Sequence, residues 1–391
     1  MIQINDKAEC VGCSACVAVC PRNCIEMKED REGFLYPRVR KSQCIHCGLC
    51  EKVCPTKKFY PSRKEPLYVY AAINNSDTIR ERSSSGGVFY TLAEYIIKHN
   101  GIVYGAVFDE NWEVHHIGIE VIEDISLMQG AKYVQSRMEN CYREVECNLQ
   151  TGRLVLFSGT PCQNAGLRSF LRKDYNNLFC IDIICHGVPS PKVWRHYLRM
   201  IEKRYGKTTD RNLAPVFRSK VEGWNNYSLV ISVADGRKYC KKANEDLYLK
   251  TYLQDVFLRP ACYQCHFKPS INHSDMVIAD FWGIEDISKE MFDDKGTSLV
   301  IINTAKGREL FDNIKYKFKY KEELYTEAIK GNPSAISSVR YRKDRRWFLV
   351  WLNIGKNIEW VIRWVNYQTA GRKSKVWFSK RWKGIKNIIK G

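Results

Sequence analysis

The sequence predicts a chain of mixed α+β and α/β class: a small cysteine-rich domain, a larger mixed α/β domain and a basic helical tail. Three observations support this prediction. Two cysteine runs of identical spacing lie near the N-terminus, short apolar strands alternate with helical patterns through the middle, and basic residues gather toward the C-terminus. We place the domains at residues 1–60, 61–335 and 336–391.

The N-terminal cysteines follow the spacing C-x2-C-x2-C-x3-C-P twice, ending at Pro21 and at Pro55. This doubled pattern is typical of bacterial ferredoxins, in which the fourth cysteine of each run binds the other run's 4Fe-4S cluster. The first predicted cluster uses Cys10, Cys13, Cys16 and Cys54, and the second uses Cys44, Cys47, Cys50 and Cys20. Zinc knuckles are the alternative, but the eight cysteines with two prolines fit iron–sulfur better. Cys24 and His46 are interpreted as packing and loop residues.

Composition and charge narrow the possible classes of protein. The 17 cysteines of the 391 residues stand largely in metal-ligand spacing, and the first residues, MIQINDKAEC, lack a basic-then-apolar signal segment. We therefore expect a reducing, cytoplasmic compartment. The net charge of +19 is uneven, because Arg340–Gly391 carries fifteen Lys and Arg against two acids and leaves only +6 for the rest.

The middle of the chain begins as an α/β unit. Its expected elements are a strand over Leu67–Ile73, a helix from Val88 to near Gly101 and a strand over Ile102–Val107. The turn Ser83–Gly87 opens the helix, where hydroxyls and free backbone N–H groups can bind an anion. A flavin pyrophosphate is the candidate beside an electron carrier, and a plain helix cap is the alternative. A further strand, Glu113–Glu120, turns one of two adjacent histidines toward the core.

Four more cysteines lie on three later segments. Two buried strands, Arg153–Phe157 and Leu178–Ile184, are followed by Cys162 and Cys185, and ligands gather at the carboxyl ends of parallel strands. A C-x2-C pair adds Cys262 and Cys265. Together they predict a third metal site, for which the spacing allows zinc or a 4Fe-4S cluster. Strands over Ser274–Ala279 and Thr297–Asn303 follow.

Seven motifs between Ser83 and Asn303 resemble the coenzyme F-420 hydrogenase/dehydrogenase beta-subunit family. They are SSSGG, GAKYVQS, FSGTPCQ, CHGVPS, CYQCHF, SDMVIADFWG and GTSLVIIN. The resemblance implies an N-terminal ferredoxin-like domain and a mixed α/β domain that binds FAD and a further 4Fe-4S cluster. It implies an oxidoreductase that passes electrons between clusters, flavin and substrate, and bacterial members are often linked to surface-polysaccharide synthesis. No motif identifies a catalytic residue or the hydride acceptor.

Carried over to this chain, the resemblance assigns individual residues. It implies a third cluster on Cys162, Cys185, Cys262 and Cys265. It implies FAD contacts from Ser84, Ser85, Gly86, Gly87, Lys132, Tyr133 and Gln135, with Thr160 and His186 near the junction of cluster and flavin. The expected partners are a ferredoxin or another low-potential donor, such as a reduced deazaflavin, and a small-molecule or sugar-linked substrate. The alternative is a non-catalytic electron-transfer subunit that feeds a separate reductase.

The tail predicts a basic amphipathic helix. Apolar residues recur at helical spacing from Trp347 to Val365, and Arg345, Lys356 and Arg363 interrupt any run long enough to span a membrane. Such a helix suits peripheral contact with the inner face of an anionic membrane. Packing on the catalytic body and attraction of an acidic ferredoxin are alternatives. Nucleic acid is not expected, since no known binding module is present.

Overall fold

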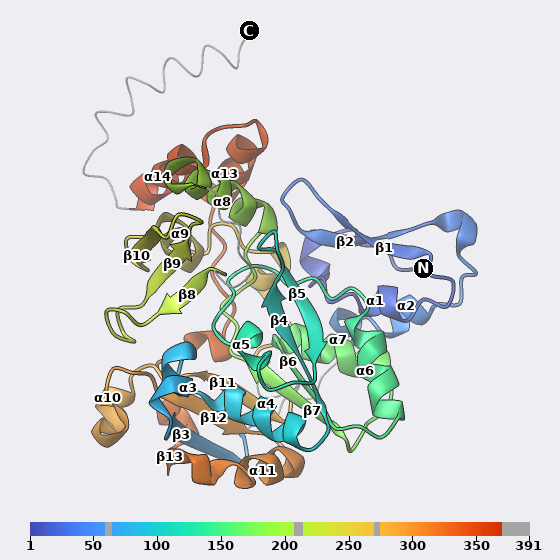
Figure 1. The fold of residues 1–391 in the computed structure, drawn as a ribbon. Coiled ribbons are helices and arrows are strands. Elements are labelled where there is room, and N and C mark those ends of the chain that lie inside the picture. Colours follow the sequence, from blue (N-terminus) through green and yellow to red (C-terminus); the bar gives the residue numbers. More distant parts are fainter. Residues whose placement is uncertain (59–64, 207–213, 270–273, 370–391) are drawn as a thin grey trace.

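The computed structural model describes residues 1–58, 65–206, 214–269 and 274–369. A small N-terminal lobe lies beside a large mixed sheet, and the helices α13 (Asp344–Asn353) and α14 (Ile358–Thr369) lie far from β13 (Phe318–Glu322) (Figure 1). The expected class, a ferredoxin-like lobe followed by a mixed α/β body, is confirmed.

The N-terminal lobe is a β-hairpin flanked by two short helices. Strands β1 (Ile25–Glu29) and β2 (Leu35–Val39) are antiparallel. The first cysteine run enters α1 (Ala15–Ala18) and the second enters α2 (Leu49–Lys52). Gly12 and Gly48 both have φ of 75°, a left-handed conformation that glycine adopts without strain, so each cysteine loop can turn sharply before its helix.

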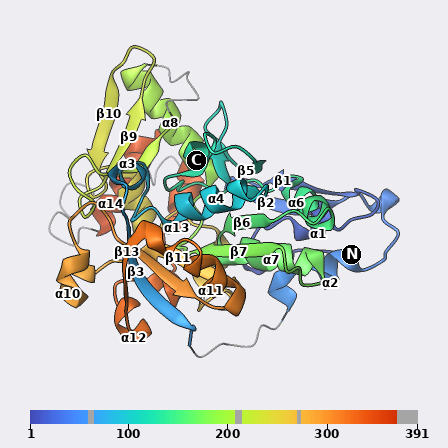
Figure 2. The same cartoon turned by 60° about the horizontal axis from the view of Figure 1, so that its bottom comes forward.

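The body is built on an eight-stranded sheet of order β13-β3-β12-β11-β7-β6-β4-β5, seen from a second direction in Figure 2. Four of these strands, β11, β7, β6 and β4, are parallel to one another, and the other pairings are antiparallel. The strand bounds are β3 Tyr68–Asn74, β4 Ile102–Phe108, β5 Val114–Ile119, β6 Val155–Gly159, β7 Leu178–Ile183, β11 Met276–Asp280 and β12 Ser298–Ile302. These confirm the strands expected from the sequence. The edge strand β13 was not expected, because FKYKE has the charged pattern of an exposed edge.

Helices cover both faces of this sheet, as the side chains of β4 show, because successive ones pack into different cores. Val103 and Val107 pack in one core with α4 (Val88–Lys98), whereas Ile102 and Tyr104 pack in another with α6 (Cys141–Gln150) and α7 (Pro161–Leu171). The remaining helices are α3 Asp77–Arg82, α5 Ile125–Met128, α8 Pro191–Tyr205, α9 Leu247–Leu253, α10 Ile284–Ile287, α11 Ala305–Asp312 and α12 Tyr325–Ala328.

A second, three-stranded sheet of order β10-β9-β8 was not expected from the sequence. Its strands are β8 Val216–Ser219, β9 Ser228–Ser232 and β10 Lys238–Lys242. Buried residues of β8, β9 and β10 share one apolar core with α8, α9, α13 and α14. Through β8 this sheet contributes Arg218 to the wall of a cavity in the body.

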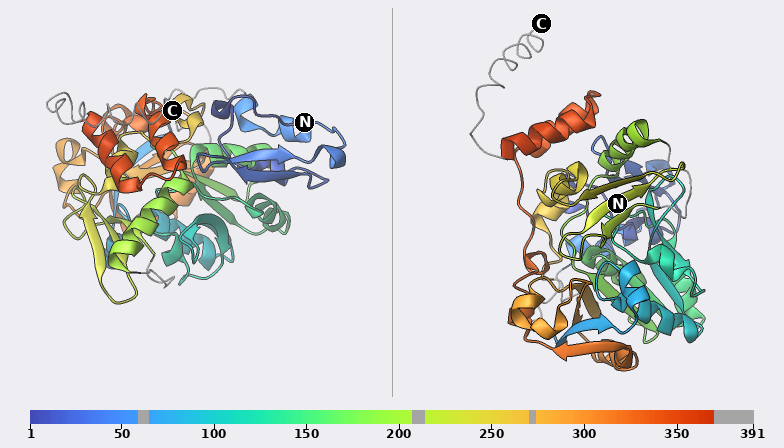
Figure 3. Two further views of the ribbon diagram at one scale, coloured as in Figure 1. Left: turned by 90° about the horizontal axis from the view of Figure 1, so that it is seen from above. Right: turned by 60° about the vertical axis from the view of Figure 1, so that its left-hand side comes forward.

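The tail forms two helices where one was predicted. Gly355, with φ of 80°, breaks the helix between α13 and α14, which project together at one end of the molecule (Figure 3). Their buried apolar residues are Phe348, Leu349, Leu352, Ile358, Val361, Ile362 and Val365. The packing alternative therefore holds for α13 and α14, and residues 370–391 lie outside the described residues. None of the described helices is long and apolar enough to cross a membrane.

Replacing Ile362 by Ala tests the docking of α14. Ile362 is fully buried against the body, so the smaller side chain leaves a cavity and should lower the free energy of unfolding by about 2–4 kcal/mol. Ile354→Ala is the matched control, because Ile354 is 65% exposed and its loss should change stability little. Urea denaturation checks both variants, and equal effects would contradict the docked arrangement.

Asp182 should make stability depend on pH. Burial raises the pKa of this fully buried β7 carboxyl to about 7, although Asn164 donates a 2.7 Å hydrogen bond to it. The folded state therefore holds a proton that the unfolded state releases at lower pH, so stability is lost as pH rises from about 4 to about 7. We expect the melting temperature of the wild type to fall between pH 5 and pH 7.5 relative to Asp182→Asn. If the melting temperatures of the two proteins change equally with pH across this range, the assigned role of Asp182 is wrong.

Candidate functional site

The first predicted cluster group gathers from the loop before α1, from α1 itself and from the segment after α2. Cys13 and Cys16 are enclosed, and burial, together with the nearby thiols of Cys10 and Cys54, raises their pKa. The Cys54 sulfur also lies 3.1 Å from the hydroxyl of Thr56. The structure thus brings these four cysteines together, and their ligation of a cluster stays a prediction.

The second predicted group lines a separate small cavity at the outer end of the lobe. Cys20, Cys44, Cys47 and Cys50 all border it, together with Cys24 and His46. The backbone N–H of Ile2 donates to the Cys50 sulfur at 3.2 Å, and the Cys20 and Cys24 sulfurs lie 3.4 Å apart. Cys47 is exposed, whereas the other three are buried or half-buried. A ring of cysteines around a cavity suits the predicted cluster.

The third group assembles from the carboxyl ends of two parallel strands and a helical turn. Cys162 follows β6 in the first turn of α7, Cys185 follows β7, and Cys262 lies in the turn Pro260–Gln264 just before Cys265. Burial and the other three thiols raise the pKa of Cys162. The four cysteines therefore face one another across three segments, as the motifs suggested.

Hydrogen bonds reach the sulfurs of this group as well. The Thr160 hydroxyl lies 3.2 Å from the Cys162 sulfur, and the backbone N–H of Val188 donates to the Cys262 sulfur at 3.3 Å. Such contacts adjust the potential of a bound cluster. Within the described ranges, no three His, Cys, Asp or Glu side chains are arranged around a single metal ion.

One buried arginine joins the first group to the third. Arg259 is 1% exposed and precedes Cys262 by three residues. Its guanidinium donates to the carbonyl oxygens of Cys10 at 2.7 Å and Leu35 at 2.9 Å, and to the side chain of Gln135 at 3.1 Å. Its Nη2 also lies 3.5 Å from the Cys10 sulfur. The two cysteine groups are therefore held against each other by one cation.

Helix α7 makes a second contact between these groups. Gly166 lies one turn after Cys162, and a Cβ atom added to it would stand 2.9 Å from the Cβ of Cys13. Only a glycine permits this approach, since real Cβ atoms do not come so close. The helix that begins at the third group thus packs directly on the first.

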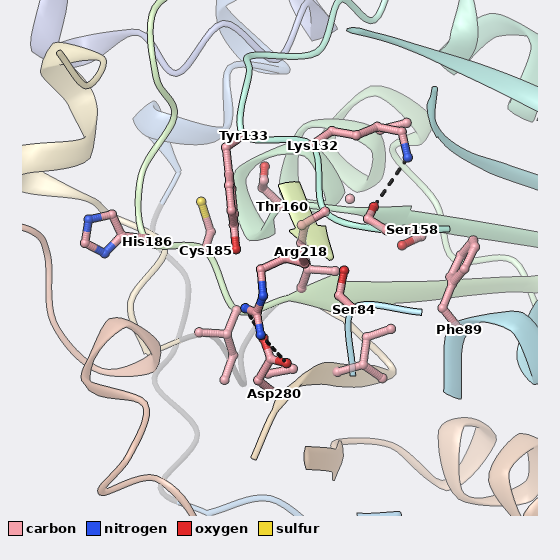
Figure 4. Close-up of a pocket in the computed structure, with 18 of the residues that line it drawn as sticks. Ser84, Phe89, Lys132, Tyr133, Ser158, Thr160, Cys185, His186, Arg218 and Asp280 are labelled. Carbon is pink, nitrogen blue, oxygen red and sulfur yellow. Dashed lines mark hydrogen bonds and ion pairs between the residues drawn. The ribbon is translucent and has the colours of Figure 1, made fainter. Parts of the chain in front are cut away.

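A cavity of about 480 Å³ opens beside the third group. Cys162 and Cys185 line it, as do all but one of the predicted FAD contacts, namely Ser84, Ser85, Gly87, Lys132, Tyr133, Gln135 and Thr160. Gly86 is the exception, since it does not line the cavity. It packs into the sheet, where an added Cβ would lie 2.2 Å from the Ala72 carbonyl oxygen. Figure 4 shows Thr160 and Cys185 at one side of the cavity and Ser84 and Phe89 at the other.

The cavity contains polar groups suited to an anionic ligand. The Ser84 hydroxyl is buried and has no hydrogen-bond partner among the described residues. It stands beside the first turn of α4, whose N-cap residue Gly87 provides no side-chain cap. Lys132 also lines the cavity, but its ammonium donates to the carbonyls of Met128 and Gln129 at 3.2 and 3.0 Å. Burial lowers the pKa of Lys132 to about 7.

The aromatic side of the cavity was only partly expected. The Tyr133 ring lies 4.9 Å from that of Tyr252. Arg218 pairs with Asp280 at 2.9 Å and stacks on Tyr227 with its guanidinium 3.9 Å from the ring centre. Asp280 belongs to the motif SDMVIADFWG, but no role was predicted for it. Arg218 had no sequence signal, because it reaches the cavity from the small sheet.

Two histidines border the cavity and differ in burial, His116 and His186. His116 is buried, with Nδ1 2.6 Å from the Ser136 hydroxyl and Nε2 3.1 Å from the Ser158 carbonyl, and burial lowers its pKa to about 4. This confirms one histidine facing the core. His186 lines the cavity as expected, and its Nε2 lies 2.7 Å from Asp255.

Comparison with known proteins identifies the class and then the family. Residues 9–58 match the model of the 4Fe-4S dicluster domain, and residues 152–328 match the model of the C terminus of the coenzyme F420 hydrogenase/dehydrogenase beta chain. These matches define an iron–sulfur electron-transfer protein of the oxidoreductase type. Over residues 152–328 the chain belongs to the coenzyme F420 hydrogenase/dehydrogenase beta-subunit family, and an N-terminal 4Fe-4S dicluster domain precedes this part.

Among solved structures, a chain of the F420-reducing [NiFe] hydrogenase complex from Methanosarcina barkeri is similar to this chain. It matches with a TM-score of 0.45 and 16% sequence identity, over 75% of this chain and 91% of that chain. No curated protein matches the sequence.

Replacing Arg259 by Met should loosen the contact between lobe and body. The change leaves two buried carbonyl oxygens without their donor, at a cost of about 1–3 kcal/mol for each unsatisfied group. We expect faster amide hydrogen exchange at residues 10–13 and altered absorption of any bound cluster. Arg195→Met is the control. Half-exposed Arg195 also joins lobe and body, through ion pairs with Glu29 and Glu113, but such solvated pairs contribute little to stability, so this change should have a smaller effect. Unchanged exchange in Arg259→Met would contradict the assigned role.

Proposed function

We propose that the protein is a flavin-dependent iron–sulfur oxidoreductase. In this proposal electrons pass from a low-potential donor through three cysteine-held clusters to FAD and on to a small-molecule substrate. One observation carries the proposal: Cys162 and Cys185 line the same cavity as the predicted FAD contacts, while Arg259 fixes the first cysteine group behind them. When bound, the clusters would supply one-electron steps and FAD would couple them to two-electron chemistry.

The residues of the cavity fit a flavin nucleotide. The unpartnered Ser84 hydroxyl and the N-terminus of α4 suit a pyrophosphate, because both offer donors to an anion. Tyr133 and Tyr252 offer an aromatic wall for a ring system. Lys132, with its ammonium bound to carbonyls, serves mainly to hold the loop that carries Tyr133.

The protein's own groups would also set the order of electron flow. Thr160 and Val188 contact sulfurs of the third group, and Arg259 places a positive charge beside Cys10. Donors and positive charge near a cluster stabilise its reduced, more negative state. The outermost group, with Cys47 exposed, is where we place contact with a separate ferredoxin or another low-potential donor.

For the acceptor we propose a small polar molecule, with sugar-linked intermediates of surface-polysaccharide synthesis as first candidates. The family resemblance supports this choice. The stacked pair of Arg218 and Tyr227 also suits a polar ring at the end of the cavity.

Anaerobic purification with metal and flavin analysis tests the proposal. Three clusters correspond to about twelve irons and about twelve sulfides per chain, and we expect bound FAD with them. Iron without flavin would favour the non-catalytic electron carrier, and zinc without a visible chromophore would refute both functions.

Cys162→Ser tests the relay itself. The variant should lose about four irons, keep the spectra of the two N-terminal clusters and stop reduction of FAD by a low-potential donor. Cys240→Ser, which changes an exposed cysteine outside the three groups, is the control. Full flavin reduction in Cys162→Ser would show that the third group is not on the electron path.

A further inference from the structure

Helix α13 carries two apolar stripes on different faces. Phe348, Leu349 and Leu352 pack into the body. Trp347, Val350, Trp351 and Ile354 recur at i, i+3, i+4 and i+7 and form the second stripe. In this stripe Trp347 is 51% exposed and Ile354 is 65% exposed, so the structure leaves an apolar face turned outward.

The second stripe continues onto α14 through a cluster of indoles. The Trp351 ring centre lies 6.5 Å from that of Trp347, 5.0 Å from Trp360 and 4.1 Å from Trp364. Trp347 and Trp360 are the exposed tryptophans of the described chain. We call this surface, made of Trp347, Val350, Trp351, Ile354, Trp360 and Trp364, the tryptophan face. Soluble surfaces rarely gather large apolar groups without a partner.

Exposed basic side chains lie on the same segment as the tryptophan face. The exposed basic residues here are Lys343 just before α13, Arg346 on α13, Lys356 in the turn and Arg363 on α14. Among the described residues, only Arg363 of these four forms an ion pair, with Glu359. The chain that continues beyond Thr369 adds eight Lys and Arg and no acid in its sequence. Exposed indoles and exposed cations on the same two helices are complementary to an interface that is apolar inside and anionic outside.

We propose that the tryptophan face binds an anionic lipid surface, with Trp347 and Trp360 entering the headgroup region and the basic residues contacting lipid phosphates. Indoles favour this boundary because one edge is apolar and the N–H is polar. Apolar burial and electrostatic attraction together give stable attachment where either alone is weak. A second copy of the chain is disfavoured as the occupant, because two strongly basic faces would repel each other. The inference does not depend on the cofactors of the proposed function.

Co-sedimentation with vesicles tests the proposal on the full-length protein. The wild type should bind phosphatidylcholine vesicles that contain phosphatidylglycerol, bind pure phosphatidylcholine far more weakly and lose affinity at high salt. Trp347→Ser/Trp360→Ser should bind the anionic vesicles roughly tenfold more weakly, since less apolar area enters the interface. The blue shift of tryptophan emission on binding should shrink in parallel.

A matched control removes apolar surface elsewhere. Tyr316→Ser/Leu324→Ser changes residues that are 73% and 71% exposed beside β13, at the far end of the molecule, and should bind as the wild type does. Equal melting temperatures and iron contents show that both variants fold. Wild-type affinity in the tryptophan variant would overturn the proposal and assign binding to basic charge alone. A wild-type dimer that the tryptophan variant converts to a monomer would instead identify a self-association surface.

Discussion

The arrangement depends on the burial of one guanidinium between the N-terminal lobe and the body. A buried arginine is costly unless its N–H donors find acceptors, and Arg259 finds them in two carbonyls of the lobe and in Gln135 of the body. Because the same residue stands three positions before Cys262, the position of the lobe is tied to that of the third cysteine group. Tyr36 adds its ring face 4.3 Å from the cation.

The parallel part of the sheet explains why cysteines so distant in sequence meet. Strands β6 and β7 run side by side in the same direction, so the residues that follow them emerge at one edge. Thr160 then caps α7 with Gln163, which places Cys162 in the first turn and directs the helix toward the lobe. Gly166 allows that helix to touch the Cys13 loop. One strand–helix junction therefore serves both the cavity and the lobe.

The sequence predicted the parts of this molecule whose signals are local. Strand β7 was predicted from its apolar run, and the cysteine groups from spacing and motifs. Contacts made across the chain had no such signal, since Arg259 meets Cys10 at a separation of 249 residues and Arg218 arrives from an unpredicted sheet. Gly86 was expected at the cavity because the motif contains it, but its lack of a side chain serves contact with Ala72. The tail is helical as its apolar spacing predicted, but Gly355 divides the predicted single helix into α13 and α14.

The exposure of a single cysteine in the second group bears on chemical durability. Among the twelve predicted ligands Cys47 is the exposed one, whereas Cys13, Cys20 and Cys50 are buried and the others are half-buried. Oxygen and peroxide attack accessible sulfur and iron first. Under the proposed function, a cluster held by Cys47 would therefore be the first to be oxidised in air.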